Sequence, residues 1–164
     1  MRSGCGRTLD TVSEIEIRAV RFDAPVAQHL IQAALADLGV RYGGSGDDTP
    51  VDAAEFEPPN GAFLVAYLAG EPVGCGGWRS HGADSAELKR MYTAPAARGR
   101  GVARTVLAAV ERSAREQGRK RVVLECGDKQ PEAIAMYGSA GYERIPNFGF
   151  YKDAEGCLSF GRTL

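Results

Sequence analysis

The segment from residue 85 to residue 125 limits the folds open to this chain more than any other stretch. Residues 85–93 have the pattern of a strand, residues 93–101 (TAPAARGRG) form a turn, and an amphipathic helix follows. A short β-branched strand, residues 121–125, ends the segment. Because a helical crossover brings the two strands it connects into parallel alignment, the segment predicts one parallel strand pair.

The first third of the chain predicts one strand, one helix and a long loop. Residues 15–19 alternate between apolar and charged side chains, as in a half-buried strand. Asp23 is a suitable N-cap for the amphipathic helix that follows, and Gly39 is expected to end that helix. Residues 41–60 are rich in Gly, Asp and Pro, with at most one short helix near residues 51–56.

The remaining elements predict antiparallel pairing. Residues 62–68 and 73–79 have the pattern of two strands joined by a Gly-Glu-Pro turn, which favours a hairpin. A helix at residues 131–139 leads to two final strands. The order of elements predicts an α+β fold whose sheet is mostly antiparallel, with helices between some of the strands.

The composition is that of one globular domain. The chain has 164 residues and a formal net charge of −1. We expect a flexible tail at residues 1–13 and a single domain over residues 14–164. The near-neutral charge argues against a nucleic-acid partner, and no apolar run approaches the ~18 residues of a membrane span. Residues 1–13 lack the apolar core of a signal peptide, so a cytoplasmic location is expected.

The cysteines give no sign of a metal site. Cys5, Cys75, Cys126 and Cys157 stand far apart, and no CxxC or Cys/His spacing connects them. This distribution predicts free thiols in a reducing compartment. Cys126 ends a strand, and without a His partner in view it is expected to be a small buried thiol rather than a nucleophile.

Positive charge is unevenly distributed along the chain. Half of the 20 basic residues lie between positions 88 and 121, together with only two acidic residues. They are Lys89, Arg90, Arg98, Arg100, Arg104, Arg112, Arg115, Arg119, Lys120 and Arg121. Two interpretations stay open. Part of the set binds a small polyanion, or the set forms a solvated helix face.

The turn at residues 98–103 (RGRGVA) lies where a strand ends and a helix begins. A helix N-terminus presents unpaired backbone N–H groups and the positive end of the helix dipole. Gly99 and Gly101 let an anion approach the backbone closely. Three arginines, at positions 98, 100 and 104, add positive charge. The turn is therefore a candidate phosphate-binding site, and a flexible turn without a ligand is the alternative.

Two common phosphate-binding motifs fit this turn poorly. A P-loop needs Gly-Lys-Ser/Thr, which is absent. A dinucleotide-binding turn has the pattern G-x-G-x-x-G, and Arg104 occupies the place of its third glycine. Glu125, at the end of the next strand, suits a ribose. However, the consecutive strands before the turn do not fit a doubly wound parallel sheet.

A third pattern fits better. Residues 98–103 have the form Arg-x-x-Gly-x-Ala, preceded by the strand ELKRMY and followed by a long helix. This resembles motif A of the GCN5-related N-acetyltransferase (GNAT) superfamily. Residues 130–137 (QPEAIAMY), followed by Gly141-Tyr142, resemble the helix and strand of motif B of the same family. The order of elements is similar to that fold from about Ile15 to the C-terminus.

The resemblance implies a GNAT-type fold, in which a twisted sheet of six to seven strands contains one parallel pair that splays apart. It also implies acetyl-CoA as the cosubstrate, without a metal. Its pyrophosphate would lie on the motif A turn, and its pantetheine in the gap between the splayed strands. The implied cofactor-binding residues are Met91, Tyr92, Thr93, Arg98, Gly99, Arg100, Gly101, Val102, Ala103 and Arg104. An N–H near Met91 or Tyr92 would polarise the thioester carbonyl.

Glu87 and Tyr137 are the expected catalytic residues. A comparable acidic residue at the position of Glu87 serves as base in some family members, so Glu87 would take the ammonium proton through water. Tyr137 occupies the general-acid position of the family and would donate a proton to the departing thiolate. The alternatives are a solvated Glu87 at the strand edge and a Tyr137 that belongs to the core.

The period of a strand predicts the direction of the side chains around Glu87. Residues 87, 89 and 91 should share one face of the strand, and residues 88, 90 and 92 the other. Lys89 and Arg90 are thus expected on opposite faces.

The resemblance implies an N-acetyltransferase that moves an acetyl group from acetyl-CoA to a primary amine of a small molecule or a peptide. The transfer would be direct, in a ternary complex. The alternatives are a non-catalytic acyl-CoA-binding module and, less well supported, a dinucleotide-dependent oxidoreductase. A monomer and a homodimer both stay open.

Two groups of residues are candidates for contact with the acceptor. Residues 41–60 carry five acids, which form either an attractive rim for an amine or a merely soluble loop. Four aromatic residues lie near the last two strands and either wall a pocket or cap the sheet. They are Tyr142, Phe148, Phe150 and Tyr151.

Overall fold

The structure is a computed structural model that describes residues 14–164, and the tail expected at residues 1–13 lies outside the described residues. The strands are β1 (Ile15–Val20), β2 (Gly61–Leu68), β3 (Glu71–His81), β4 (Ser85–Thr93), β5 (Arg121–Gly127), β6 (Glu143–Ile145) and β7 (Cys157–Thr163). The helices are α1 (Pro25–Tyr42), α2 (Val102–Glu116) and α3 (Pro131–Ser139), with short 3-10 helices η1 (Ala53–Phe56) and η2 (Pro95–Ala97). This is the order of elements that the sequence predicts.

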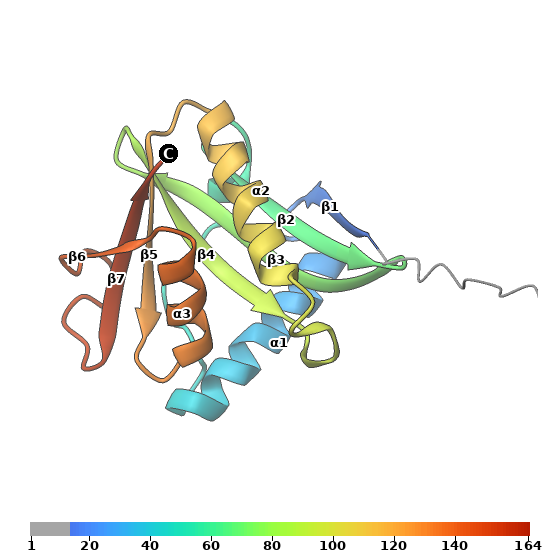
Figure 1. Ribbon diagram of the computed structural model, residues 1–164, viewed down its shortest axis with the longest axis horizontal. Helices are drawn as coiled ribbons and strands as arrows, with labels where there is room; N and C mark the ends of the chain where they lie inside the picture. Colours follow the sequence, from blue (N-terminus) through green and yellow to red (C-terminus); the bar gives the residue numbers. More distant parts are fainter. Residues whose placement is uncertain (1–13) are drawn as a thin grey trace, which may run out of the picture.

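The strands form one sheet in the order β1-β2-β3-β4-β5-β7-β6 (Figure 1). Neighbouring strands are antiparallel except β4 and β5, which are parallel and connected through α2. The predicted fold class is therefore confirmed. A doubly wound parallel sheet, which the glycine pattern left as an alternative, is incompatible with this topology.

The parallel pair is short. β4 and β5 pair only from Ser85 with Arg121 to Glu87 with Val123. Beyond these pairs, β4 stays paired with β3 and β5 stays paired with β7, so the facing edges of β4 and β5 diverge (Figure 1). Within the part of the chain that the structure describes, the backbone groups on these two edges have no strand partner. Unpaired backbone donors and acceptors favour a ligand that can pair with them.

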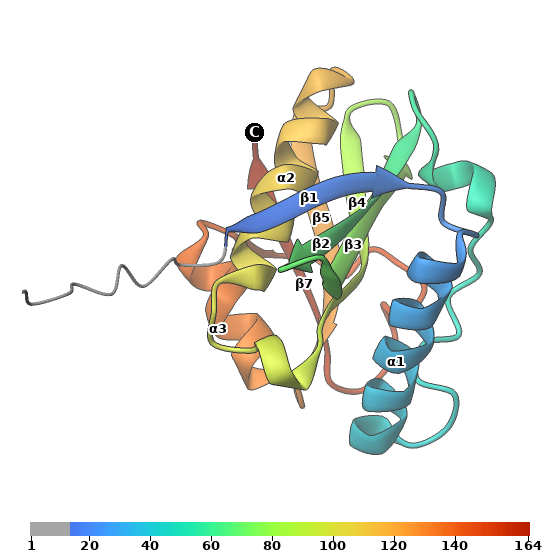
Figure 2. The ribbon, with the colours of Figure 1, turned by 90° about the vertical axis from the view of Figure 1, so that its right-hand side faces the viewer.

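Helices cover both faces of the sheet (Figure 2). α2 and α3 pack on one face, over a core that includes Trp78, Val110 and Leu124. α1 packs on the other face, over a smaller core in which Phe22 and Phe56 stack with ring centroids 4.5 Å apart. Apolar packing thus supports the sheet on both sides of the place where β4 and β5 separate.

α1 begins one residue later than predicted and ends about one turn later. Its N-cap is Ala24, and Asp23 forms an ion pair with Arg21 instead of capping the helix. The helix also continues through Gly39 to Tyr42. Gly39 is needed for packing, because a Cβ there would lie 2.9 Å from the carbonyl oxygen of Gly44. The longer helix brings its last turn to the opening between β4 and β5.

β4 contains a bulge at Arg90. The register of β4 with β3 shifts between Cys75 and Gly77, so that one extra residue stands on β4. Arg90 has a φ of 60°, in the left-handed region that residues with a side chain rarely adopt. The Cys75 thiol donates a hydrogen bond to the Arg90 carbonyl oxygen over 3.3 Å and so supports the bulge.

The bulge makes the predicted alternation of side chains wrong. Lys89 and Arg90 lie on the same face, the one covered by α1, where both contact Asp47. Met91 then packs into the core under α2, and Tyr92 into the core under α1. An extra residue shifts every later side chain to the opposite face, because a strand repeats every two residues.

Candidate active site

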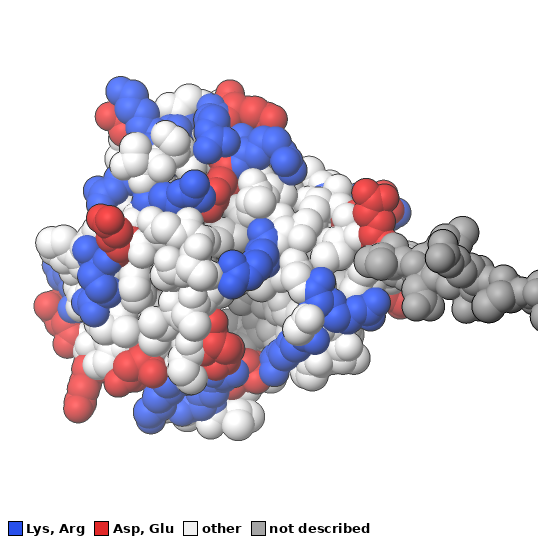
Figure 3. Space-filling model, in the orientation of Figure 1, with Lys and Arg blue, Asp and Glu red and all other residues white. Residues whose placement is uncertain are grey.

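A cavity of about 660 Å³ lies in the opening between β4 and β5. Its walls come from α1, β4, the turn before α2, the first turn of α2, β5, α3 and the loop before β7. The molecular surface is hollowed between α2 and α3, and Lys and Arg side chains border the hollow (Figure 3). The cavity therefore lies where the sheet leaves backbone groups unpaired.

Most of the predicted cofactor-binding residues come together in this cavity. Met91, Tyr92, Thr93, Arg98, Gly99, Gly101, Val102, Ala103 and Arg104 all line it. Arg100 does not line it and lies beside a separate small hollow with Leu68 and Glu71. The motif A resemblance thus named residues that line the cavity, but it does not distinguish Arg100 from the arginines on either side.

The glycines of the turn are required by the backbone conformation. Gly99 and Gly101 have φ values of 76° and 82°, and a Cβ on either would meet no atom within 4 Å. Gly101 is the N-cap of α2, and its carbonyl oxygen accepts a hydrogen bond from the Thr105 N–H over 3.1 Å. The following N–H groups, at the start of α2, have no partner within the helix and suit an anion.

Arg98 is held at the edge of the cavity. Its Nε donates a hydrogen bond to the Thr93 carbonyl oxygen over 3.1 Å, and its Nη2 lies 3.8 Å from an Asp37 carboxylate oxygen. Arg98 and Asp37 are both partly exposed. An anion at the turn would therefore compete with Asp37 for the Arg98 guanidinium.

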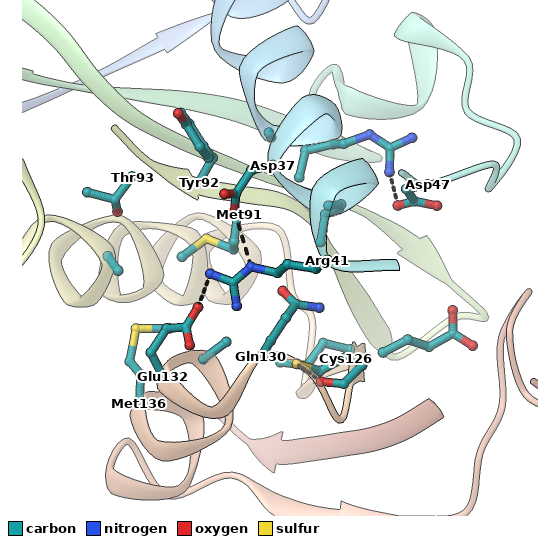
Figure 4. A pocket seen from close by; sticks show the side chains of 18 of the residues that line it. Asp37, Arg41, Asp47, Met91, Tyr92, Thr93, Cys126, Gln130, Glu132 and Met136 are labelled. Carbon is teal, nitrogen blue, oxygen red and sulfur yellow. Dashed lines mark hydrogen bonds and ion pairs between the residues drawn. The ribbon is translucent and has the colours of Figure 1, made fainter. Parts of the chain in front are cut away.

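The last turn of α1 is connected to α3 and to the loop before it. Figure 4 shows Arg41 between Asp37 and Glu132, and it forms an ion pair with each. The Lys129 N–H also donates to the Tyr42 hydroxyl over 3.0 Å. We call these contacts the α1–α3 clasp. The clasp joins the β4 side of the opening to the β5 side.

Tyr137, on α3, is buried and lines the cavity. Its ring packs against Tyr142, with centroids 5.7 Å apart, and against Phe160. Burial raises the pKa of Tyr137 above its ordinary value, with a smaller contribution from Cys126. Cys126 also lines the cavity, and burial raises its pKa to about 11, so its thiol stays protonated near neutral pH.

Glu87 is buried, but it is not among the residues that line the cavity. Its carboxylate accepts a hydrogen bond from Arg79 Nε over 2.7 Å, and Arg79 also pairs with Glu55 over 3.1 Å. Of the two predicted catalytic residues, Tyr137 thus lines the cavity and Glu87 does not. Glu87 lies close enough to two lining residues, Lys89 and Glu125, to act on them electrostatically.

Asp47, from the acidic loop, meets two cations that the sequence analysis did not assign to acceptor contact, Lys89 and Arg90, at the α1 side of the site. Asp47 pairs with Arg90, and it lies 3.6 Å from Lys89 Nζ, which also donates to Thr49 Oγ1 over 3.2 Å. Burial opposes the charge of Asp47, but Lys89 and Arg90 outweigh it and leave the pKa of Asp47 below its usual range. Burial lowers the pKa of Lys89, against the opposing effect of Asp47.

Glu125 is the fourth charged residue at this end of the cavity. Its Oε1 accepts a hydrogen bond from the Tyr151 N–H over 3.1 Å, and its Oε2 is buried without a hydrogen-bond partner. Its carboxyl group lies against the backbone of Gly149, where a Cβ would be 2.5 Å away. Burial raises the pKa of Glu125, partly offset by the bond from Tyr151.

Only some residues of the two groups proposed for acceptor contact line the cavity. Asp47 from the acidic loop and Tyr151 from the aromatic group line the cavity. The Tyr151 hydroxyl accepts a hydrogen bond from the Asp48 N–H over 2.6 Å, which connects the two loops. Tyr142 is buried against Tyr137, and Phe148 packs against His81 instead. Position along the chain alone did not separate these cases.

Two kinds of feature are missing from residues 14–164. No helix there is long and apolar enough to cross a membrane. No group of three or more His, Cys, Asp and Glu side chains in that range is arranged to hold a metal ion.

The architecture and the cavity agree with comparisons with known proteins. Residues 27–142 match the Acetyltransferase (GNAT) family. The match covers the α1 region, the splayed strand pair, the glycine turn and α3. The chain therefore belongs to the GNAT acetyltransferase family.

Two curated proteins are similar in sequence. The uncharacterized N-acetyltransferase YjgM of Escherichia coli is 39% identical over 93 residues, which is 55% of this chain and 56% of that protein. An IAA acetyltransferase of Azospirillum brasilense is 35% identical over 102 residues, 62% of this chain and 67% of that protein. The chain thus matches little more than half of the first protein and two thirds of the second.

Solved structures have the same fold. A Klebsiella pneumoniae protein, provisionally named an acyl-CoA N-acyltransferase, superposes with a TM-score of 0.76 at 28% identity. The match covers 92% of this chain and 97% of the Klebsiella pneumoniae chain. A GNAT family acetyltransferase from Elizabethkingia anophelis, solved with acetyl-CoA bound, has a TM-score of 0.68 at 16% identity, covering 92% and 98%. At that identity the second likeness concerns the fold alone.

Proposed function

We propose that this protein transfers an acetyl group from acetyl-CoA to a primary amine, by direct transfer while both substrates are bound. The observation that carries the proposal is the opening between β4 and β5, which leads to the glycine turn at the start of α2. Unpaired strand edges suit the amide groups of a pantetheine chain, and a helix N-terminus suits a pyrophosphate. The similar fold from Elizabethkingia anophelis holds acetyl-CoA.

The residues present fit the donor. Gly99 and Gly101 add no side chain to the turn, and Arg98 and Arg104 line the cavity next to it. Met91, Tyr92 and Thr93 are the β4 residues that would pair with the pantetheine. When bound, acetyl-CoA supplies an activated acetyl group as a thioester.

The chain would assist the transfer at three places. A backbone N–H near Met91, just after the β4 bulge, would stabilise the charge that develops on the carbonyl oxygen. Glu87 would accept a proton from the amine through water, since its carboxylate lies outside the cavity lining. Tyr137 would donate a proton toward the departing sulfur, and its raised pKa keeps its hydroxyl protonated.

An assay of thiol release from acetyl-CoA, run with a panel of amines, tests the proposal. We expect release that depends on the amine, together with calorimetric binding of CoA but not of NAD(P). Binding of CoA without transfer to any amine would favour the non-catalytic acyl-CoA-binding module instead. Binding of NAD(P) in place of CoA would overturn the proposal.

A further inference from the structure

The β4 bulge gives the α1 side of the cavity, where Asp47, Lys89, Arg90 and Glu125 lie, an unusual set of charges. In a regular strand, Lys89 and Arg90 would point to opposite faces, but the bulge turns both toward α1 and into the cavity lining. Their side chains are only 7% and 5% exposed. Two cations buried side by side require compensation, because burial of an unpaired charge is costly.

Among the described residues, one carboxylate forms ion pairs with both cations, while Glu87 and Glu125 act on Lys89 from farther away. Asp47 is the carboxylate that pairs with both cations. Glu87 is engaged by Arg79, and Glu125 is held under the 146–156 loop by the Tyr151 N–H. The two buried cations therefore share one directly paired carboxylate.

Two polar atoms at this end of the cavity have no partner. Arg90 Nε and Glu125 Oε2 are both buried without a hydrogen bond. Such atoms are uncommon in folded proteins, because a buried polar group without a partner costs free energy. Both side chains line the cavity. One atom is a cationic donor and the other an anionic acceptor.

From these groups we infer that the acceptor is an α-amino acid, in which a carboxylate stands next to the reacting amine. Its carboxylate binds Arg90 and Lys89, and its ammonium group binds Glu125 before transfer. The inference rests on the proposed function, because it assigns the acceptor of the same reaction. It names a substrate that carries both charges, whereas the acidic loop alone would favour a plain amine.

The position of the groups agrees with this assignment. Lys89 and Arg90 immediately precede Met91, whose backbone is expected to lie beside the thioester. A carboxylate on these cations therefore places the adjacent amine near the carbonyl carbon. Arg90 presents a planar fork that suits a carboxylate, and Lys89 adds a second charge.

The experiment compares matched pairs of acceptors that differ only in the carboxylate. Each standard L-amino acid is paired with the amine left by its decarboxylation, for example L-phenylalanine with 2-phenylethylamine and L-leucine with 3-methylbutylamine. We expect at least one pair in which kcat/KM favours the amino acid by about tenfold or more, the usual effect of a hydrogen bond to a charged group. Calorimetric titration of the same compounds onto the protein measures the preference without turnover.

Variants locate the preference. Arg90→Gln and Lys89→Met should each reduce it to near equality by raising KM for the amino acid, while KM for the plain amine changes little. Arg112→Gln, on an exposed position of α2, is the control and should keep the full preference. If Arg90→Gln does not fold, Lys89→Met and the wild-type comparison still decide the question.

The outcomes separate this inference from the proposed function. Equal use of amino acids and plain amines, or a preference that survives both variants, overturns the amino-acid assignment and leaves the acetyltransferase in place. Failure to bind CoA overturns the proposed function, and calorimetry with the amino acids alone then decides the inference. Absence of binding by every amino acid also overturns it.

Discussion

Arg98 and Asp37 face each other across the mouth of the cavity, with 3.8 Å between the guanidinium and the carboxylate. Arg98 belongs to the turn before α2, and Asp37 belongs to α1. Asp37 therefore pairs with a guanidinium that the phosphates of the donor would use. Binding of CoA would have to exchange one anion for another at Arg98.

Removal of that competition should strengthen CoA binding. We expect Asp37→Asn to lower the Kd for CoA about two- to threefold at low salt, because exposed ion pairs contribute little and are screened. Asp84→Asn is the matched control, since Asp84 forms a similar exposed pair with Lys120 at 3.8 Å, away from the cavity. Calorimetry at two salt concentrations measures both variants, and equal Kd values would show that Asp37 does not compete.

Gly101 offers a test of the turn itself. Gly101→Ala places a side chain at a φ of 82°, and Gly101→Asp adds a negative charge at the start of α2. We expect the Asp variant to raise the Kd for CoA about tenfold or more, and the Ala variant to raise it less, because only the first repels phosphate. Gly118→Ala, with similar strain at a φ of 78° beyond the other end of α2, should leave the Kd unchanged.

Glu87 can be separated into a structural and a chemical role. Arg79→Met leaves the buried Glu87 carboxylate without its main partner and should lower the free energy of unfolding by about 3 kcal/mol. Glu87→Gln keeps a hydrogen-bond acceptor for Arg79 and should instead lower kcat/KM, most strongly at acid to neutral pH. An unchanged pH–rate profile in Glu87→Gln would remove Glu87 from the mechanism.

Tyr137→Phe removes one hydroxyl from the cavity wall and keeps the aromatic packing with Tyr142. If the hydroxyl donates to the departing sulfur, kcat should fall about tenfold or more, while the Kd for CoA stays near the wild-type value. Single-turnover kinetics measure the chemical step. A wild-type rate would assign Tyr137 to packing alone.

Glu125 predicts a pH dependence of stability. Because burial raises its pKa in the folded state, the folded protein binds the proton more tightly than the unfolded chain. Its stabilising contribution is therefore full below the ordinary pKa of a glutamate and is lost as the pH rises through the folded-state pKa. Glu125→Gln should raise Tm at pH 7–8 relative to the wild type and change it less at pH 4. The opposite order would contradict the raised pKa.

Sequence patterns predicted the parallel pair and the glycine turn, because each depends on local spacing, and the resemblance to the GNAT family implied the position of the cavity. Residues 85–125 define strand, turn and helix within one short stretch, and Gly99 and Gly101 reflect the local backbone. The continuation of α1 through Gly39 could not be predicted in this way. Its role depends on the carbonyl group of Gly44, which returns to it only after the chain has turned.

Of the features that the sequence analysis missed, the β4 bulge has the largest effect on the site. The bulged residue is Arg90 rather than a glycine, and the Cys75 thiol that supports the bulge comes from β3. Without the bulge, Lys89 and Arg90 would lie on opposite faces of β4. In the sequence, Asp47 is one of several acids in the same loop. Its pairing with both cations is a tertiary contact that the sequence pattern does not indicate.

The short pairing of β4 with β5 has a consequence for the timescale of motion in the sheet. Hydrogen bonding divides the sheet into two parts, β1-β2-β3-β4 and β5-β7-β6. Three residue pairs between β4 and β5 join the two parts, and the α1–α3 clasp and side-chain packing add to this connection. Amide hydrogens along the diverging edges should exchange quickly with solvent in the free protein. A bound pantetheine chain would act as the missing strand, so donor binding and completion of the sheet would be a single event.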